Sequence, residues 1–210
     1  MSTPSEPTKG ERTRARIVAT AAPLFNQRGF DGASMSDLMA ATGLEKGGIY
    51  RHFESKDELA FAAFDYLIEK HQERIHSFID AQTTAVARLT ALGEAIASLA
   101  ERPAVKGGCP LLNTAVESDD AKGPSYAELR KRTRAGMRRL IGYARHIIEE
   151  GIASGELQPT LDAAREAELM IATMEGALMI SKLFDEPRYV LQAAAHFGHL
   201  ASRMARSQAG

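Results

Sequence analysis

The sequence contains little cysteine and no long apolar run. Its single cysteine, Cys109, excludes an intramolecular disulfide and is typical of a protein kept in a reducing cytoplasm. Its apolar runs all fall short of the roughly 20 residues that a membrane-spanning helix needs. The polar residues 1–9 do not resemble a signal peptide. We therefore expect a cytoplasmic protein that does not insert into a membrane.

The chain also lacks an excess of charge of one sign. Its formal net charge is −1 over 210 residues, which excludes a polycation that binds nucleic acid over its whole surface. Any nucleic-acid site must therefore be a local patch. With 44% hydrophobic and 25% charged residues, the composition supplies enough apolar material for one large or two small domains.

Signals for β-strands are nearly absent, whereas helix signals recur along the chain. Four residue pairs have the spacing of a capping box, in which two side chains bind free amides of the first turn. They are Thr8 with Glu11, Ser34 with Asp37, Ser55 with Glu58, and Ser125 with Glu128. Gly29, Gly43 and Gly155 are predicted to end helices. Pro23 should kink the first helix, because proline cannot donate its amide to the helix ladder.

These signals predict an all-α fold of about nine helices. The expected ranges are 9–28, 35–42, 46–53, 56–79, 84–101, 109–118, 125–154, 162–184 and 188–206. We expect a disordered arm at residues 1–8, a first helical domain at 9–55 and a second, larger helical domain at 56–210.

The segment "SMSDLMAATGLEKGGIYRHF" predicts a helix-turn-helix, because two short helices flank a turn that carries Gly43. Ile49 and Phe53 lie about one turn apart on the second helix and are expected to face the core. The residues that then point outward are Gly47, Gly48 and Arg51. Glycine in a helix costs about 1 kcal/mol relative to alanine, so a glycine pair here needs a reason.

We interpret that reason as close contact with DNA. A second helix without side-chain bulk can bring its backbone near the base edges of a major groove. Tyr50 and His52 flank this surface, while Lys46 and Lys56 lie near its two ends. The alternative is an ordinary loop with core aromatics. A loop alone does not explain the adjacent caps, the glycine turn and the nearby cations.

Two neighbouring features favour the same interpretation. Ser34, at the start of the preceding helix, lies where helix amides and the helix dipole attract phosphate, and Ser36 is placed to reach a base edge. Upstream, the run "KGERTRAR" forms a positive patch of Lys9, Arg12, Arg14 and Arg16. Alone, such a run is more often a solvated helix face.

The segment "RARIVATAAPLFNQRGFDGASMSDLMAATGLEKGGIYRHFESKDEL" resembles the DNA-binding domain of TetR/AcrR-type transcriptional regulators. The resemblance lies in a helix that ends in Gly-Phe, the helix-turn-helix "ATGLEKGGIYRHF", and the following "SKDEL". It covers residues 9–60, about a quarter of the chain. Beyond it, the similarity rests on the number and length of the helices.

The resemblance implies a homodimer that binds double-stranded operator DNA and responds to a small-molecule effector. By analogy, Lys46, Tyr50, His52 and Lys56 contact phosphates. Ser36, Gly47, Gly48 and Arg51 face bases, and Ser34 anchors a helix on the DNA backbone. Many members have serine or threonine where this chain has Gly48, so one donor is lost and DNA shape can matter more.

Apolar stripes in the second domain are candidates for a ligand pocket between helices. The candidate residues are Phe61, Phe64, Leu67, Leu92, Ile96, Leu112, Met137, Ile141, Met170, Met174 and Leu178. The alternative is plain core packing, which is the commoner role of such stripes. Glu175 interrupts the apolar run "LMIATMEGALMI"; it can bind a ligand donor, pair across a subunit interface or reach solvent.

Cys109, in "KGGCPLLN", is a candidate electrophile or redox sensor. Nearby Lys106 and the start of a helix are expected to lower its thiol pKa. The alternative is an inert, small apolar side chain. His196 and His199 share a helix face but lack a third ligand, so we expect no metal and no cofactor.

The last two helices combine large apolar residues with small ones, which predicts a four-helix dimer interface. The small residues are Gly176, Ala177, Ala194, Ala195, Gly198 and Ala201. Internal packing alone is the alternative. The run "ELRKRTRAGMRR" is interpreted as a solvated helix face with acidic partners.

The sequence therefore predicts a regulator, more specifically a repressor, that a small molecule releases from DNA. We expect no enzymatic activity, because Cys109 has no neighbouring base in the sequence. A helical adaptor that no longer binds DNA is the remaining alternative.

Overall fold

The computed structural model describes residues 6–101, 103 and 105–206, and this part of the chain forms nine helices and no β-strand. They are α1 (Lys9–Gly32), α2 (Met35–Thr42), α3 (Lys46–Tyr50), α4 (Lys56–Ile79), α5 (Ala85–Glu101), α6 (Pro110–Ser118), α7 (Pro124–Ala153), α8 (Ala163–Phe184) and α9 (Arg188–Met204). The all-α prediction is confirmed. Most of the arm expected at residues 1–8 lies outside the described residues.

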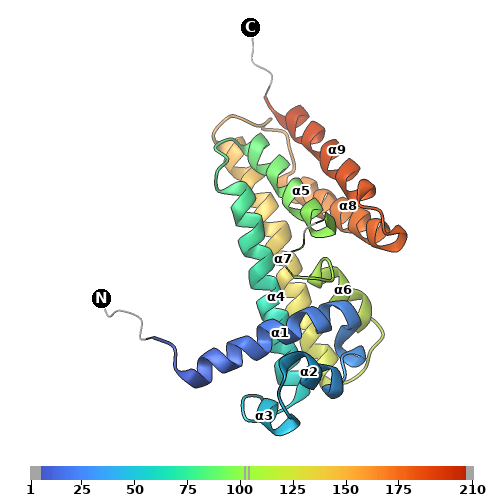
Figure 1. The fold of residues 1–210 in the computed structure, drawn as a ribbon. Coiled ribbons are helices and arrows are strands. Elements are labelled where there is room, and N and C mark those ends of the chain that lie inside the picture. The colour runs from blue at the N-terminus through green and yellow to red at the C-terminus, as the bar shows by residue number, and fades with distance from the viewer. Residues whose placement is uncertain (1–5, 102, 104, 207–210) are drawn as a thin grey trace.

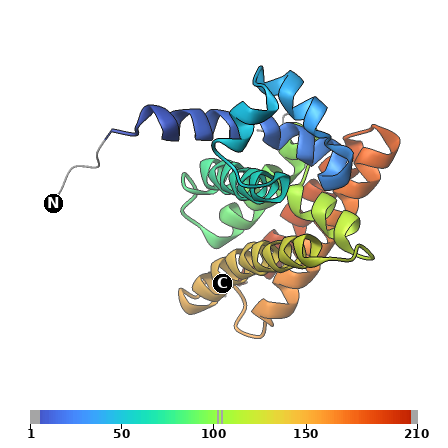
Figure 2. The same cartoon turned by 90° about the horizontal axis from the view of Figure 1, so that it is seen from below.

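The helices form two units that share α4. Helices α1 to α3 lie at one end of the molecule, and α4 leads from them toward the opposite end (Figure 1). Helices α5, α7, α8 and α9 pack on one another in the second unit. Seen from below in Figure 2, the N-terminal part of α1 projects away from the rest of the molecule.

Each unit has its own apolar core. Ile17, Leu38, Ile49 and Phe53 are fully buried in the smaller core, where the first half of α4 covers them. The larger core is formed by buried side chains of the second half of α4 and of α5 to α9. Because α4 contributes to both cores, it connects the two units rigidly.

The predicted caps are confirmed at the first two helices. The Thr8 and Ser34 hydroxyls each accept a hydrogen bond from the amide three residues later, and the Thr8 and Ser34 amides donate in turn to the carboxylates of Glu11 and Asp37. Ser55 also caps α4, although Glu58 accepts from Glu54 instead of from Ser55.

The fourth predicted cap is wrong. Helix α7 begins one residue before Ser125, at Pro124, and Gly123 is its N-cap residue. Proline is favoured at this first helical position because it has no amide to satisfy. The Ser125 hydroxyl is therefore free to leave the helix end, and it donates a hydrogen bond to Asp57 at the start of α4.

Two of the three predicted helix ends are confirmed. Gly43 caps α2 in the left-handed region, with φ 66°, and Gly155 has φ 79° just beyond α7. Gly29 interrupts α1 without ending it: its φ of 79° and ψ of 177° break the helix, which resumes and extends to Gly32. The break thus falls at Gly29 and not at Pro23.

None of the helices in the described ranges is long and apolar enough to cross a membrane.

Candidate nucleic-acid interface and effector cavities

The start of α2 is fixed by an internal network. The Ser34 hydroxyl donates to Asp37 Oδ2 at 2.6 Å, and Arg28 Nη1 lies 2.6 Å from Asp37 Oδ1. These contacts, with that of Ser34 the stronger, lower the pKa of the Asp37 carboxyl to about 2. Asp37 is therefore ionised at neutral pH, and α2 is held to α1 through Arg28.

Helix α3 is shorter than expected, because it ends at Tyr50 instead of residue 53. Ile49 and Phe53 are 1% and 2% exposed, which confirms that they face the core. Gly47 is exposed, and a methyl group at its position would meet no atom within 4 Å. The outer surface of α3 is therefore bare at Gly47.

Gly48 lies nearer to the rest of the protein than Gly47 does. A methyl group at Gly48 would lie 3.4 Å from Cβ of Leu44, in the turn that precedes α3. Gly48 is half-buried for this reason. The two glycines of the pair therefore differ: Gly47 is open to a partner, while a side chain at Gly48 would be in van der Waals contact with Leu44.

The nine residues predicted to contact DNA lie between the N-cap of α2 and the first residue of α4, at the α2–α3 end of the molecule (Figure 1). Ser36 and Arg51 are exposed, and Tyr50 is 38% exposed. Lys46 Nζ lies 5.8 Å from the Tyr50 ring centroid, and Lys56 Nζ lies 4.9 Å from that of Phe30. His52 is half-buried. These residues present hydroxyls and cations around the bare glycine.

The positive patch on α1 is smaller than the sequence indicated. Arg14 forms an ion pair with Glu58 at 3.0 Å, and its guanidinium lies 4.6 Å from the centre of the Phe53 ring. Arg14 thus helps to hold α1 against α4. Lys9, Arg12 and Arg16 remain exposed on the projecting part of α1.

Glu117, on α6, binds the break in α1 directly. Its Oε1 accepts hydrogen bonds from the amides of Phe30 at 2.5 Å and Asp31 at 3.3 Å. A methyl group at Gly29 would lie 2.5 Å from the same oxygen. Glycine is therefore needed at position 29 for two reasons, its positive φ and the close approach of the carboxylate. The sequence gives no signal for Glu117, because 87 residues separate the partners.

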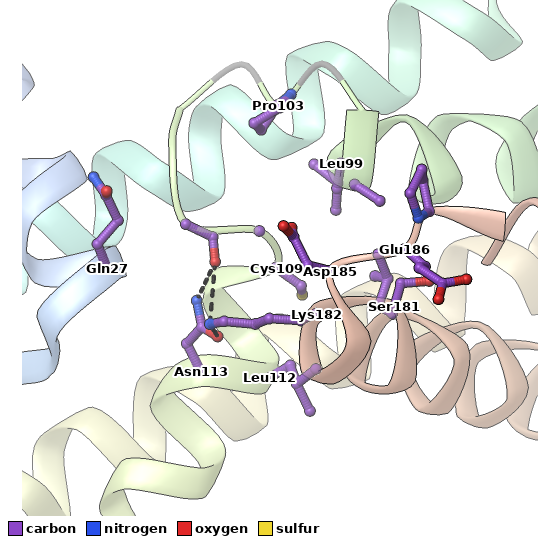
Figure 3. A pocket seen from close by; sticks show the side chains of 15 residues that line it. Gln27, Leu99, Pro103, Cys109, Leu112, Asn113, Ser181, Lys182, Asp185 and Glu186 are labelled. Atoms are coloured by element: carbon purple, nitrogen blue, oxygen red, sulfur yellow. Dashed lines mark hydrogen bonds between the residues drawn. The ribbon is translucent and has the colours of Figure 1, made fainter. Parts of the chain in front are cut away.

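A second polar contact connects α1, α6 and α8. The Asn26 amide donates to the backbone oxygens of Lys106 and Gly108 at 3.0 and 3.1 Å. Asn113 donates to Asn26 Oδ1 at 3.0 Å and accepts a hydrogen bond from Lys182 at 2.7 Å. Figure 3 shows Asn113 and Lys182 directed toward each other. The unit formed by α1 to α3, called the DNA-side unit below, is therefore joined by hydrogen bonds to the second unit.

A first cavity of about 290 Å³ lies beside this polar contact (Figure 3). It is lined by the end of α5, the segment before α6, and the C-terminal part of α8. Of the candidate ligand residues, Leu112 and Leu178 line it, as does Cys109. Lys182, at its wall, already donates to Asn113.

The structure contradicts the predicted activation of Cys109. The thiol is 3% exposed, and burial, followed by the nearby Glu175 carboxylate, raises its pKa well above the usual value. Amides at the start of α6 act in the opposite direction, but they are outweighed. Sγ donates to Glu175 Oε1 at 3.2 Å. Cys109 is thus a protonated hydrogen-bond donor at neutral pH.

Glu175 does not reach solvent, because it is only 7% exposed. Burial raises the pKa of its carboxyl to about 7, and Oε2 has no hydrogen-bond partner among the described residues. Glu175 therefore lies in the larger core beside Cys109.

A second cavity, of about 270 Å³, lies among α4, α6 and α7. Its lining residues are Ile68, His71, Gln72, Ile75, His76, Leu111, Gly136, Arg139, Leu140 and Tyr143. His71 is 5% exposed, and neither ring nitrogen has a hydrogen-bond partner among the described atoms. Burial lowers the pKa of His71 to about 4, so the imidazole is neutral at pH 7.

Most of the predicted ligand residues lie in the apolar cores. Phe64 and Leu67 line only a small cavity of about 20 Å³ beside Glu117. Phe61 lines a different cavity, of about 510 Å³. The remaining candidates line neither the cavity beside Cys109 nor the one beside His71; they are Leu92, Ile96, Met137, Ile141, Met170, Met174 and Glu175. The cavity containing His71 was missed because its lining comes from three separate helices.

Helices α8 and α9 carry an exposed apolar surface. Its large side chains are Leu169, Met179, Ile180, Leu183, Phe184 and Leu191, which are between 36% and 74% exposed. Monomeric proteins rarely expose a continuous apolar surface of this kind. The arginine-rich run on α7 has the predicted acidic partners in part, since Arg132 pairs with Glu128 and Asp65.

Comparisons with known proteins place this geometry in a family. Residues 17–63 match the family described as "Bacterial regulatory proteins, tetR family", and residues 85–197 match "Tetracyclin repressor-like, C-terminal domain". A TetR transcriptional regulator from Chloroflexus aurantiacus J-10-FL has a similar structure, with TM-score 0.88 and 46% identity, over 94% of this chain and 98% of that one.

Two further relatives support the assignment. The HTH-type transcriptional repressor DhaR of Mycobacterium sp. strain GP1 is 26% identical over 171 residues, covering 81% of this chain and 82% of that protein. The TetR-family regulator CifR, solved as a cysteine mutant with 26-bp operator DNA, shares the fold with TM-score 0.78 and 19% identity, over 94% and 98% of the two chains. The helix-turn-helix, the helical second unit and these similarities together show that the chain belongs to the TetR family of transcriptional regulators.

Proposed function

We propose that this protein is a cytoplasmic repressor that binds operator DNA as a homodimer and leaves it when a small molecule binds. The observation that carries this proposal is the bare surface at Gly47, held outward by the buried Ile49 and Phe53. A surface of this shape fits a major groove. The role requires no reaction on a substrate.

The proposed DNA contacts follow from the surroundings of α3. Lys46, Tyr50 and Lys56 are placed to bind phosphates, together with His52 at the edge of the same surface. Gly47 and Gly48 bring the backbone near the bases, and Ser36 and Arg51 supply the donors that read them. Ser34 is already occupied by Asp37, so its role is to fix the start of α2 against the DNA backbone.

The proposed dimer forms through α8 and α9. Their exposed apolar side chains would be covered by the same helices of a second copy, giving a four-helix interface. Such a dimer presents two copies of α3 to successive major grooves, which lie about one helical turn of DNA apart.

Effector release would act through the contacts between the two units. Helix α4 belongs to both cores, and Glu117 of α6 holds the break in α1. A ligand that shifts α4 or α6 changes the spacing of the two α3 helices. DNA affinity then falls by the factor with which the ligand prefers the shifted state.

A gel-shift titration against DNA from upstream of the protein's own gene tests the proposal. Specific binding should weaken as salt rises, because phosphate contacts release counterions. Lys56→Ala and Tyr50→Ala should each weaken binding, and Lys56→Ala should reduce the salt slope by about 1.

Lys131→Ala is the matched control, because Lys131 is an exposed lysine on α7 and not among the residues assigned to the DNA contact. It should leave affinity and slope unchanged. Sedimentation should show the same dimer for all variants. If both test variants bind like the wild type, the assigned contacts are wrong; if the wild-type protein itself shows no salt-sensitive specific complex, the adaptor alternative is favoured.

A further inference from the structure

We propose that the cavity among α4, α6 and α7 is the effector site, and that its ligand is a small apolar carboxylic acid with a hydroxyl group remote from the carboxylate. This inference rests on the proposed function, because it names the ligand of that regulator. It is carried by the polarity of the cavity from its buried end to its opening.

The buried end of the cavity is apolar. Ile68, Ile75, Leu111 and Leu140 are all between 1% and 6% exposed. Space bounded by such side chains favours a ring or a short hydrocarbon chain, because placing apolar surface there removes it from water. The volume of about 270 Å³ suits a ligand built on a single ring.

His71 provides the one polar group among these buried side chains. Buried polar atoms are almost always hydrogen-bonded, so two unpartnered ring nitrogens call for a missing partner. Since the imidazole is neutral, it offers one N–H donor and one acceptor. A hydroxyl group can use either of these. A carboxylate could use only the N–H and would be desolvated beside an uncharged partner, so the charged end of the ligand does not lie here.

The opening of the cavity instead favours an anion. Gln72, His76, Arg139 and Tyr143 line it, and none of the described lining residues is acidic. Asp80, which is not among the lining residues, lies 3.3 Å from His76 Nδ1. Arg139 is exposed and forms no ion pair with any residue that the structure describes. An exposed arginine without an ion-pair partner can bind a carboxylate through two parallel hydrogen bonds.

The position of the cavity connects it to DNA binding. His71 lies on α4, which contributes to both cores, and Leu111 lies on α6, six residues before Glu117. A ligand that fills this space contacts both helices that hold α1. The cavity beside Cys109 lacks these features, because its lysine is already bonded to Asn113 and it has no unpartnered buried polar group among its described lining.

Calorimetric titration of the full-length dimer with benzoate, 4-hydroxybenzoate, 3-phenylpropionate and 3-(4-hydroxyphenyl)propionate tests the inference. At least one hydroxylated acid should bind more tightly than its parent acid. The corresponding uncharged amides should bind about 10-fold more weakly or worse, because they lose the charge-assisted contact with Arg139.

Three variants separate the two ends of the site. Arg139→Gln should weaken all the acids about 10-fold, whereas Arg138→Gln changes an exposed neighbouring arginine outside the cavity and should have no effect. His71→Leu should weaken only the hydroxylated acids, by about 10-fold, because it removes the hydrogen bond and keeps the apolar volume. Circular dichroism and melting curves check that each variant is folded.

The outcomes distinguish this inference from the function on which it rests. If no acid binds, or if Arg139→Gln and His71→Leu bind all the acids like the wild type, the inference is wrong, whatever the DNA result. If the acids bind as described but do not release operator DNA, the binding site stands and the proposed ligand-controlled repression fails.

Discussion

The DNA-side unit and the second unit differ in where they place their polar groups. Around α3, the hydroxyls and cations are exposed or paired at the surface, as with Asp37 and Arg28. In the second unit, His71 and Glu175 are buried with unpartnered atoms. The first arrangement suits a preformed surface that recognises a rigid partner. The arrangement in the second unit leaves polar atoms without hydrogen-bond partners inside the protein. There, binding of a ligand or of a proton can shift the equilibrium between conformations of the protein.

The sharpest test of the exposed surface around α3 is the substitution Gly47→Glu. The substitution should lower operator affinity at least about 100-fold, since it places bulk and negative charge against the DNA, yet it should leave stability within about 0.5 kcal/mol. Gel shifts and chemical denaturation measure the two effects. Gly142→Glu alters another exposed helical glycine without neighbours within 4 Å and should leave DNA binding unchanged. Equal effects of the two substitutions would contradict the assignment.

The two buried titratable groups, Glu175 and His71, predict an unusual dependence of stability on pH. The pKa of Glu175 is raised from 4.5 to about 7 in the folded state, so unfolding releases its proton and stability falls as pH rises from about 4.5 to 7. The pKa of His71 is lowered from 6.5 to about 4, so stability falls as pH drops from about 6.5 to 4. Each effect amounts to about 3 kcal/mol at its limit, and the two oppose each other where they overlap.

Glu175→Gln should separate these two effects. Above pH 7 the variant should be more stable than the wild type by about 3 kcal/mol, and below pH 6.5 it should show the His71 dependence alone. Urea unfolding between pH 4 and 8 measures both. Glu168→Gln, which changes an exposed carboxylate on the same helix, should keep the wild-type profile. A Glu175→Gln profile that matches the wild type would show that Glu175 is not protonated by burial.

The contact between the units gives a smaller effect. Gly29→Ala should destabilise the protein by about 2 kcal/mol, because the new methyl group meets the Glu117 carboxylate and the residue must keep a positive φ. Gly32→Ala, three residues later, meets only Arg28 Cβ at 3.5 Å and should change stability by less than about 0.5 kcal/mol. Thermal or urea unfolding of both variants provides the measurement. Similar stabilities would remove the argument for a strained contact at Gly29.

Local signals predicted the helices and the inward packing of the helix-turn-helix well. The caps at Thr8 and Ser34 and the end of α2 at Gly43 depend on contacts within a few residues, so they can be recognised in the sequence. Inward packing of Ile49 and Phe53 follows from their spacing along one helix. Ser125 misled the same reasoning, because proline at the preceding position started the helix earlier.

The second unit could be predicted only in outline. The apolar stripes indicated helices that pack together, but they did not show which residues line a cavity. Cys109 illustrates the reason: its neighbours in the sequence suggested a reactive thiol, whereas Glu175, 66 residues away, and complete burial make it an inert donor.

Local residue patterns are sufficient to predict the helical architecture, the helix-turn-helix and the bare surface at Gly47, because these depend on backbone preferences and on spacing within one or two turns. The packing of the helices in space is needed to explain the protonation of Cys109, Glu175 and His71, the hydrogen bonds from α1 to Glu117, and the cavity among α4, α6 and α7. These depend on desolvation and on contacts between distant helices, which no local pattern of residues records.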